Sequence, residues 1–325
     1  MHTRQDAAGR LRQAFRQKER IGILMHISPD GDAIGSCLAL ANLCRVFGGE
    51  ADLYCADPVP EKYRILPGWE RIRVPGGQML PGDPYDLCVL CDVPDPGRLG
   101  EIRPLFDGAR DSLSIDHHGT NPCAASMNVV DPACAAAGEL VLDLFEILKA
   151  PLDPDSALCL YVALSTDTGH FQFSSTTAGT LRAAARTLES GVDQEKTTLA
   201  LYRTRTLSHT RLLGRALNSL ALYAGNRVSV MKLTQEDFAC AGAADEDVEG
   251  IVNYAIEIRG VCLAMLAAYR NGVWKVSLRA RDGYDVASVA RSFGGGGHKQ
   301  ASGLTLDQEE DTEKVIAALC ELAES

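Results

Sequence analysis

The chain has no apolar run near the roughly eighteen residues that a membrane-spanning helix requires, and its first twenty residues are polar where a signal peptide would be apolar. It also has no block of like charges long enough to form a basic arm or an acidic tail. Acidic residues outnumber basic ones by 43 to 32, a net charge of −11 at pH 7, so binding along a long duplex nucleic acid is not expected. We expect a cytoplasmic protein with no membrane partner.

A disulfide scaffold and a disordered chain are excluded by length and composition. The 325 residues are a little over twice a domain of about 150 residues, and 46% of them are hydrophobic, which predicts two globular domains. Most of the eleven cysteines lie within apolar runs, which favours buried thiols over disulfides. Cys88 and Cys91 form a CxxC, but they share one apolar run, and we interpret it as a buried strand.

The first half of the chain alternates apolar runs with helical patterns, which predicts an α/β fold with a parallel sheet flanked by helices. We expect a buried strand over 21–27, followed by a helix over 33–48 that ends at a glycine. Three further strands are expected over 51–56, 85–92 and 111–118. A helix is expected over 155–169. The acidic and histidine residues that stand out follow strand or helix ends, where open α/β sheets bind ligands.

Three segments describe the expected domain organisation: a catalytic domain over 1–190, a helical connector over 191–222, and a smaller α+β domain over 223–325. Helical patterns follow one another from Thr177 into the connector. Beyond it, strands and helices alternate, and the pair Asn271-Gly272 favours a hairpin turn between two strands.

The first candidate site residues follow the strand predicted over 21–27. His26 lies at the end of that strand, and Asp30 and Asp32 follow in a tight loop before a helix. An aspartate at this place is a common helix cap, and a cap needs one acceptor oxygen. An imidazole followed so closely by two carboxylates exceeds that need, which indicates a functional site.

Other acidic and histidine residues follow the ends of other predicted elements. Asp92 comes after the apolar run LCVLC, where a turn aspartate is the ordinary alternative. Two adjacent histidines, His117 and His118, come after Asp116 at another strand end. Asp167 lies near the end of a predicted helix, where the helix dipole disfavours negative charge. Their shared place at one sheet edge indicates that these residues belong to a single site.

Convergence of these side chains predicts a pair of divalent metal ions. Without cations, the repulsion among four carboxylates in one cleft would drive some of them to protonate. Imidazole and carboxylate ligands without a thiolate suit Mn²⁺, with Mg²⁺, Co²⁺ or Zn²⁺ as alternatives. Two metals about 3.5–4 Å apart activate a water and stabilise an in-line displacement at phosphorus. The predicted chemistry is hydrolysis of a phosphoester or a phosphoanhydride.

Five stretches, in a fixed order, resemble the motifs of the DHH phosphoesterases and of their DHHA1 domain: HISPDGDAIGS, CDVPDPGRLG, IDHHGTN, STDTGHFQFSSTT and GGGGHKQASG. The resemblance extends over nearly the whole chain. It implies an N-terminal DHH domain that holds two metals and a C-terminal DHHA1 domain that binds substrate. One metal is expected at His26 and Asp30 and the other at Asp32, His117 and Asp167, with Asp92 bridging the two.

The same resemblance implies roles beside the metals. Asp116 is expected to orient the ring of His117, and His118 is expected to face the substrate phosphate or the leaving oxygen. Arg98, in the stretch PGRLG, is expected to add positive charge next to the phosphate.

Substrate binding is expected in the second domain. Residues 270–299 contain six basic and two acidic residues, a basic patch in an acidic chain. A glycine run allows the backbone to approach a phosphate closely and donate N–H groups, although a flexible turn is an equal alternative. By resemblance, the substrate contacts are Arg279, Gly295, Gly296, Gly297 and His298, and Arg281 is an alternative to Arg279.

Within the DHH family, a two-domain chain of this size is similar to the NrnA-type enzymes. That resemblance implies hydrolysis of short oligoribonucleotides and dinucleotides to mononucleotides, and removal of a phosphate from the nucleoside bisphosphate 3′-phosphoadenosine 5′-phosphate. One local basic patch suits such short substrates, whereas a long strand requires an extended positive channel. The alternatives are a cyclic di-AMP phosphodiesterase and a nucleotide-binding sensor that does not hydrolyse its ligand. The resemblance also implies a homodimer.

Overall fold

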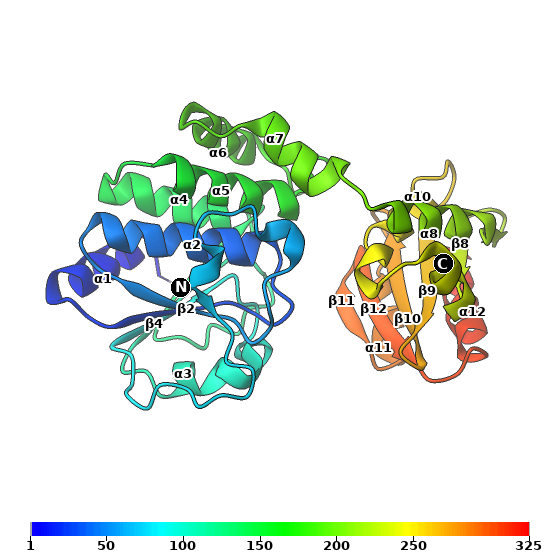
Figure 1. The fold of residues 1–325 in the computed structure, drawn as a ribbon, viewed down its shortest axis with the longest axis horizontal. Helices are drawn as coiled ribbons and strands as arrows, with labels where there is room; N and C mark the ends of the chain where they lie inside the picture. The colour runs from blue at the N-terminus through cyan, green and yellow to red at the C-terminus, as the bar shows by residue number, and fades with distance from the viewer. Residues whose placement is uncertain (1, 325) are drawn as a thin grey trace. The chain divides into compact units, whose positions relative to one another are not determined.

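A computed structural model of the chain describes residues 2–324 and contains two compact units, residues 1–203 and residues 204–325 (Figure 1). Each unit has its own sheet and its own core of buried apolar side chains. Within the described residues, every helix is too short or too polar to cross a membrane.

Unit 1 is built on six strands that all run parallel, in the order β3-β2-β1-β4-β5-β6. The strands are β1 (Ile21–Leu24), β2 (Ala51–Tyr54), β3 (Ile72–Arg73), β4 (Leu87–Cys91), β5 (Ser112–Asp116) and β6 (Met127–Val130). This confirms the predicted parallel sheet. Because both faces of the sheet are covered, the central strands β1 and β4 are apolar throughout and fully buried.

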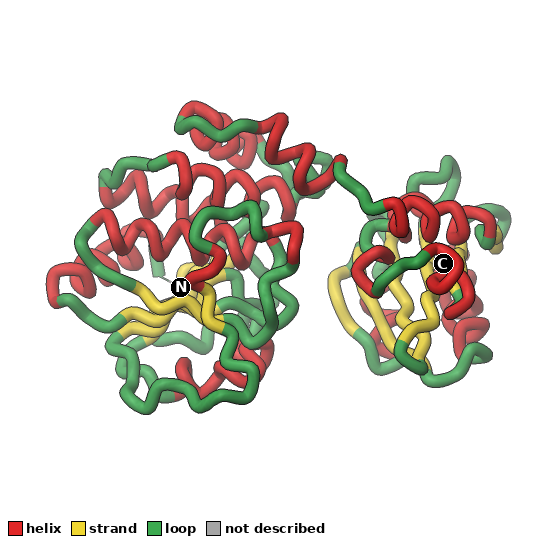
Figure 2. Tube along the Cα trace, in the orientation of Figure 1, coloured by secondary structure: helices red, strands yellow, loops and turns green. Residues whose placement is uncertain are grey.

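Helices cover the two faces of this sheet unequally (Figures 1 and 2). On one side lie α1 (Arg4–Gln17), α2 (Gly31–Val46), α4 (Ala137–Leu148), α5 (Pro154–Asp167), α6 (Ala178–Glu189) and α7 (Gln194–Thr198), with α2 and α4 nearest the strands. The other face carries the irregular helix η3 (Pro96–Ile102) and α3 (Arg103–Asp107). Cys88 and Cys91 point to opposite faces of β4, so this CxxC is part of two cores and both thiols are free.

The strand order places a ligand site in unit 1. From β1 the chain proceeds to β2 and β3 on one side, and then returns to β4, β5 and β6 on the other. The order therefore reverses between β1 and β4, and ligands of open α/β sheets bind at the carboxyl ends of the strands at such a reversal. His26 and Asp92 follow these two strands directly.

Unit 2 is smaller and has a mixed sheet in the order β11-β12-β10-β9-β8-β7, in which only β8 and β9 pair in parallel. Its strands are β7 (Ala221–Tyr223), β8 (Val228–Leu233), β9 (Leu263–Arg270), β10 (Val273–Ala280), β11 (Gly296–His298) and β12 (Ala301–Leu306). One face packs on α8 (Leu207–Asn218), α9 (Gln235–Ala241) and α10 (Ile251–Ile256). The other face packs on α11 (Val286–Ser292) and α12 (Asp311–Glu324).

The segment expected as a connector, residues 191–222, is divided between the units. Helix α7 and the π-helical turn Leu199–Arg203 belong to unit 1, where Leu201 is buried in the core. Helix α8 belongs to unit 2, where Leu212 is buried below α9. Only residues 204–206 between them are outside a helix. The apolar side chains of the π-helical turn and of α8 therefore lie in the cores of different units.

Candidate metal centre

The loop after β1 supplies two side chains, His26 and Asp30. Asp30 is the N-cap of α2, and its Oδ1 accepts a hydrogen bond of 3.0 Å from the Ala33 N–H. Its other oxygen, Oδ2, lies 3.8 Å from Nε2 of His26. The capping role and the functional role are therefore compatible, because each uses a different oxygen of the same carboxylate.

Asp32, in the first turn of α2, is fully buried and held by donors from two helices. It accepts hydrogen bonds from the Ser36 hydroxyl at 2.7 Å and from the N–H groups of Ala137 and Gly138 at 2.6 and 3.0 Å. Those two N–H groups belong to the start of α4, a favourable place for a carboxylate. Burial, followed by the charge of Asp167, nevertheless raises the pKa of Asp32 to about 8. Sequence reasoning missed Ser36, although it lies one helical turn after Asp32.

Asp92 lies between the two histidines at the end of β4. Its Oδ2 is 3.7 Å from Nε2 of His26, and its Oδ1 is 3.5 Å from Nε2 of His117. The residue has a φ of 58°, a left-handed conformation that aspartate tolerates better than most residues and that is often found at functional sites. Burial, followed by the charge of Asp32, raises the pKa of Asp92 well above its ordinary value.

His117 and Asp167 complete a second group of side chains with Asp32. Nε2 of His117 lies 3.0 Å from Oδ2 of Asp167, the last residue of α5, and 3.8 Å from Oδ2 of Asp32. Burial lowers the pKa of His117, but the adjacent carboxylates of Asp167 and Asp32 outweigh it and raise this pKa to about 9. Without a metal ion, Asp32 and His117 of this group therefore hold protons at neutral pH.

The donor set fits divalent metal ions. Nδ1 of His26 lies 2.7 Å from the Ile27 carbonyl oxygen, and Nδ1 of His117 lies 3.3 Å from that of Cys134. Because a carbonyl only accepts, both rings carry hydrogen on Nδ1, so Nε2, which faces the carboxylates, is the atom that can bind a metal in the neutral ring. Among the described residues, Oδ1 of Asp92 and Nε2 of His117 are buried atoms without a hydrogen-bond partner. A cation between them would satisfy both atoms.

The six predicted metal ligands thus come together as two groups of three. His26, Asp30 and Asp92 form one, and Asp32, His117 and Asp167 form the other. In each group the potential ligand atoms lie within 4.8 Å of one another. Asp92 also lies within reach of His117, as a shared ligand would.

Asp116 orients His118, and the expectation that it orients the His117 ring is wrong. Its Oδ1 accepts a 2.8 Å hydrogen bond from Nδ1 of His118, whereas the His117 ring donates to the Cys134 carbonyl instead. Asp116 contacts His117 only through the backbone N–H of that residue, at 2.9 Å. Adjacent residues leaving a strand point in different directions, so one carboxylate reaches one of the two rings.

Asn121 holds the other oxygen of Asp116 and was missed by sequence reasoning. Its side-chain amide donates to Oδ2 of Asp116 at 2.6 Å and to the Val93 carbonyl at 3.1 Å. Burial raises the pKa of Asp116, but hydrogen bonds from His118 and Asn121 outweigh it and lower this pKa. The carboxylate therefore stays charged beside His118. The available signal was the position of Asn121, at the end of the stretch IDHHGTN.

Arg98 lies on η3, next to the loop that carries His26. Its carbonyl accepts a 2.8 Å hydrogen bond from the Ile27 N–H, and its guanidinium Nη2 donates to the Ile27 carbonyl at 3.2 Å. The side chain is exposed. The positively charged guanidinium of Arg98 is thereby fixed at the edge of the first group of candidate ligands.

The expected substrate residues lie in unit 2. Gly296, Gly297 and His298 form β11, which pairs with β12. Arg279, on β10, donates to the amide oxygen of Asn253 at 3.2 Å and to the Leu278 carbonyl at 2.9 Å. Arg281 donates to the carbonyls of Val261 and Ile256 at 2.8 and 3.0 Å, which caps the end of α10.

Comparison with known proteins gives concordant matches for the two parts of the chain. The model of the DHH family, N-terminal domain, matches residues 20–164, and the model of the DHHA1 domain matches residues 225–325. The bifunctional oligoribonuclease and PAP phosphatase NrnA of Thermus thermophilus is 34% identical over 304 residues, which cover 93% of this chain and 89% of that protein. The enzyme of the same name from Mycoplasma pneumoniae is 28% identical, with 93% and 92% covered.

A solved structure shares the fold. An exopolyphosphatase-related protein from Bacteroides fragilis matches with a TM-score of 0.92 at 24% identity, covering 99% of this chain and 98% of that one. At this identity the likeness shows the fold alone.

Proposed function

Since the chain belongs to the DHH family and carries a DHHA1 domain, we propose that this metal-dependent hydrolase cleaves short oligoribonucleotides and dinucleotides to mononucleotides, and converts 3′-phosphoadenosine 5′-phosphate to AMP. The NrnA relatives, whose names state these two activities, support the choice of substrates. The observation that carries the proposal is the meeting of six imidazole and carboxylate side chains at the reversal of strand order in unit 1.

We propose that these six side chains hold two divalent ions, with Mn²⁺ as the preferred metal. The absence of a thiolate from both groups and the mixture of imidazole with carboxylate support Mn²⁺ over softer ions. When bound, the ions supply an activated water and positive charge for the phosphate oxygens. Asp92 is the proposed shared ligand, supported by its two oxygens facing different histidines.

His118 is the proposed general acid for the leaving oxygen. Its Nδ1 donates to Asp116, which fixes the ring and stabilises the positive charge that the ring carries before it gives up a proton. Asn121 holds Asp116 in turn. Arg98 is the proposed phosphate contact at the edge of the site, because its guanidinium is exposed and tied to the loop of His26.

Unit 2 is the proposed source of substrate contacts beyond the reacting phosphate. Arg279 is preferred over Arg281, since Arg281 already caps α10 while Arg279 donates to one side-chain amide oxygen and to one carbonyl. The glycines 295–297 and His298 are proposed to approach the substrate through backbone N–H groups and the imidazole. The homodimer, the exclusion of long duplex nucleic acid and the cytoplasmic location stay predictions.

A substrate panel tests the proposed function. The full chain is incubated with pApA, 3′-phosphoadenosine 5′-phosphate, cyclic di-AMP or a long duplex RNA, with Mn²⁺, Mg²⁺ or a chelator, and products are separated by chromatography. We expect AMP from pApA and from 3′-phosphoadenosine 5′-phosphate with Mn²⁺ and none with the chelator. Faster cleavage of cyclic di-AMP would instead assign the cyclic dinucleotide as substrate. Tight binding of pApA without turnover in Mn²⁺ would make the protein a sensor.

A further inference from the structure

The chain turns sharply where α5 ends, soon after the candidate ligand Asp167. Gly169, His170 and Phe171 have φ angles of 55°, 58° and 63°, so three consecutive residues are in the left-handed conformation. Glycine adopts this conformation freely, whereas residues with bulky side chains rarely do. A strained turn of this kind persists only where its surroundings hold it, and such turns are concentrated at functional sites.

An aromatic ring packs against each of the two side chains of this turn. The ring centroids of His170 and Tyr202 are 4.8 Å apart. Those of Phe171 and Tyr161 are 5.9 Å apart. Tyr161 is part of α5, and Tyr202 belongs to the π-helical turn Leu199–Arg203. Because π-helical turns are rare and frequently occur at functional sites, the contact with Tyr202 points to a role for this part of unit 1.

Ser165 joins these elements through its hydroxyl group. Its Oγ lies 2.8 Å from the hydroxyl oxygen of Tyr202 and 3.0 Å from Nδ1 of His170. Its carbonyl also accepts a 2.7 Å hydrogen bond from the His170 N–H. Ser165 is fully buried, so a hydroxyl without partners at this position would destabilise the fold. Ser165, His170 and Tyr202 are here called the Ser165 latch.

The Ser165 latch holds α5 from the side opposite to the metal centre. Residues two apart on a helix are separated by about 200° around its axis, so Ser165 and Asp167 point in different directions. Oδ2 of Asp167 lies 3.0 Å from Nε2 of His117, and Oδ2 of Asp32 lies 3.8 Å from the same atom. Without a metal ion, repulsion between these neighbouring carboxylates favours movement of Asp167 away from Asp32. The latch opposes such movement because it ties the end of α5 to the π-helical turn.

We propose that Ser165, His170 and Tyr202 are positioning residues for Asp167, and that they couple the π-helical turn at the end of unit 1 to the metal centre. The proposal rests on the proposed two-metal site and adds residues beyond its ligands. The latch holds Asp167 in place before a metal ion binds, so binding does not have to order the site. Because coupling between two sites is reciprocal, metal binding is expected to stabilise the π-helical turn.

The first test measures the Mn²⁺ affinity of the full chain, by titration with detection of the free ion by electron paramagnetic resonance. Tyr202→Phe keeps the ring on His170 and removes only the hydroxyl. We expect Kd for Mn²⁺ to rise about three- to tenfold, as the loss of one hydrogen bond predicts. Ser165→Ala is expected to raise Kd at least as much. Adding Tyr202→Phe to Ser165→Ala is expected to have no further effect, because the Tyr202 hydroxyl acts through Ser165.

Two results of this titration would overturn the proposal. One is an unchanged Kd in Tyr202→Phe, because the hydroxyl would then not help to hold Asp167. The other is a double variant in which the two single effects multiply, because Tyr202 would then act independently of Ser165.

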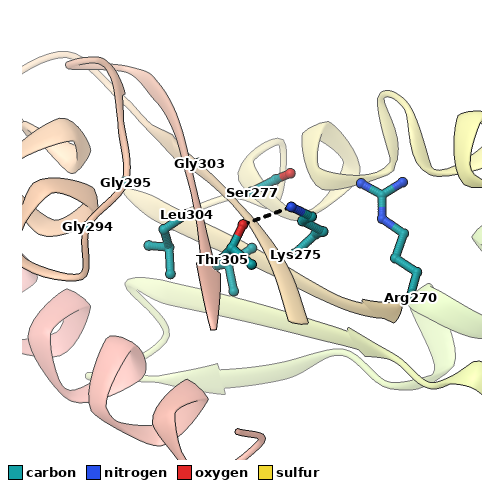
Figure 3. Close-up of a pocket in the computed structure, with 9 residues that line it drawn as sticks. Arg270, Lys275, Ser277, Gly294, Gly295, Gly303, Leu304 and Thr305 are labelled. Carbon is teal, nitrogen blue, oxygen red and sulfur yellow. Dashed lines mark hydrogen bonds between the residues drawn. The ribbon is translucent and has the colours of Figure 1, made fainter. Parts of the chain in front are cut away.

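Two variants that lose a hydroxyl elsewhere are the matched controls. Tyr161→Phe makes the same substitution on α5 itself, and the Tyr161 hydroxyl is buried without a hydrogen-bond partner among the described residues. Thr305→Val removes a hydroxyl of unit 2 that accepts a 3.0 Å hydrogen bond from Nζ of Lys275 (Figure 3). Both variants are expected to keep the wild-type Kd for Mn²⁺. A rise in either control as large as that in Tyr202→Phe would refute a specific role of the latch.

Limited digestion with trypsin tests the reciprocal effect, starting from the wild-type protein. Arg203 and Arg205 are exposed and follow Tyr202, so cleavage after them reports on opening of the π-helical turn. We expect saturating Mn²⁺ to slow this cleavage several-fold in the wild type and to slow it less in Tyr202→Phe. Equal cleavage rates with and without Mn²⁺ in the wild type would refute the coupling.

Failure of the proposed function gives a different pattern of results. A protein that binds Mn²⁺ in a Tyr202-dependent way but hydrolyses neither pApA nor 3′-phosphoadenosine 5′-phosphate would support the latch and refute the proposed substrates. A wild-type Kd in Tyr202→Phe, together with hydrolysis of both substrates by the wild type, would refute the latch alone. A wild-type protein that binds no Mn²⁺ would refute both the latch and the metal centre on which it rests.

Discussion

Asp92 belongs to the first group of candidate metal ligands and also faces His117 of the second group, through a different oxygen. Its carboxylate faces His26 on one side and His117 on the other, and the left-handed backbone at this position turns the side chain back over the end of β4. The strain of that conformation is tolerated because strands β1 and β5 on either side of β4 fix the backbone. Replacing a residue in this position is expected to reduce turnover more than replacing a residue that contacts only the substrate.

We therefore expect Asp92→Ala to abolish turnover more completely than Arg98→Ala. Asp92 is the proposed ligand of both ions, so its loss would remove the water that they would activate, whereas loss of Arg98, the proposed phosphate contact, would weaken only that contact. Arg98→Ala is expected to lower kcat/KM by roughly 10- to 100-fold, and Asp92→Ala by more than the roughly 100-fold typical of residues that merely support a ligand. Steady-state rates on pApA, with metal content from elemental analysis, check both values. Equal residual rates in the two variants would contradict the shared-ligand assignment.

The sequence predicted which residues meet, because each of the six follows a strand or helix end and parallel strands bring these ends together. It did not predict which ring Asp116 contacts. That depends on the carbonyl of Cys134, which comes to His117 from a loop seventeen residues away along the chain. Hydrogen bonds of this kind are set by tertiary packing, and no periodicity in the sequence records them.

Two helices carry the two carboxylates of the second group of ligands, and glycine allows these helices to approach closely. Asp32 lies at the start of α2 and Asp167 at the end of α5. Where these helices cross, a Cβ on Gly35 would lie 2.3 Å from the Cys159 carbonyl oxygen and 3.3 Å from the Ala163 side chain. The spacing between the two carboxylates therefore depends on a residue that has no contact with the metals.

Gly35→Ala is expected to destabilise the protein and to weaken metal binding. The added methyl group must push α2 away from the backbone of α5, a kind of overpacking that costs about 1–3 kcal/mol of unfolding free energy. Urea unfolding of the metal-free protein and Mn²⁺ titration measure the two effects. Gly9→Ala is the matched control, since Gly9 lies in α1 with open space around its Cβ position, and it is expected to stabilise the protein by roughly 0.5–1 kcal/mol. An unchanged Mn²⁺ affinity in Gly35→Ala would show that the helix spacing does not set the site.

Element type was predictable for β1, β2, β4 and β5, whose apolar runs are short and bounded by turn residues, whereas the short strands β3 and β6 were not predicted. The unit against which each helix packs was not predictable from the sequence. The π-helical turn Leu199–Arg203 and helix α8 are separated by only three residues, yet Leu201 is buried in one unit and Leu212 in the other. Strand order is likewise a tertiary property, so the reversal between β1 and β4 became visible only in the sheet.

At the scale of the whole molecule, the two units carry different residues of the proposed function. The candidate metal ligands all belong to unit 1, and the candidate substrate residues Arg279 and His298 belong to unit 2. In the proposed function, unit 1 holds the metals and unit 2 selects among phosphorylated substrates.

His298→Ala is expected to raise KM for pApA while bound metal stays unchanged. The imidazole lies outside the metal centre, on β11 of unit 2, so its removal weakens substrate binding alone; a single polar contact predicts roughly a five- to tenfold rise. Steady-state kinetics and elemental analysis of the same preparation measure the two quantities. Loss of Mn²⁺ from this variant would overturn the division between the units.

Metal binding and folding are coupled through the buried carboxylates of unit 1. Folding raises the pKa of Asp32 from 3.8 to about 8, so between these pH values the folded state holds a proton that the unfolded chain has released. The stability of the metal-free protein therefore falls as pH rises through this range. The His117 pKa, raised from 6.5 to about 9, gives a contribution that is complete below pH 6.5 and lost by pH 9. The lowered pKa of Asp116 stabilises the folded state fully above about pH 4, and this contribution is lost only as pH falls below that value.

In the proposed metal centre Mn²⁺ would take the place of these protons, so we expect its stabilising effect to grow with pH. We expect the Tm of chelator-treated protein to fall from about pH 5 to about pH 8, and the rise in Tm on adding Mn²⁺ to be larger at the higher pH. Asp32→Asn removes one of the titrating groups, so its metal-free Tm is expected to depend less on pH across the same range. A metal-free Tm that increases from pH 5 to pH 8 would mean that these side chains are not held together in the folded protein, because separated carboxylates would keep their ordinary pKa values.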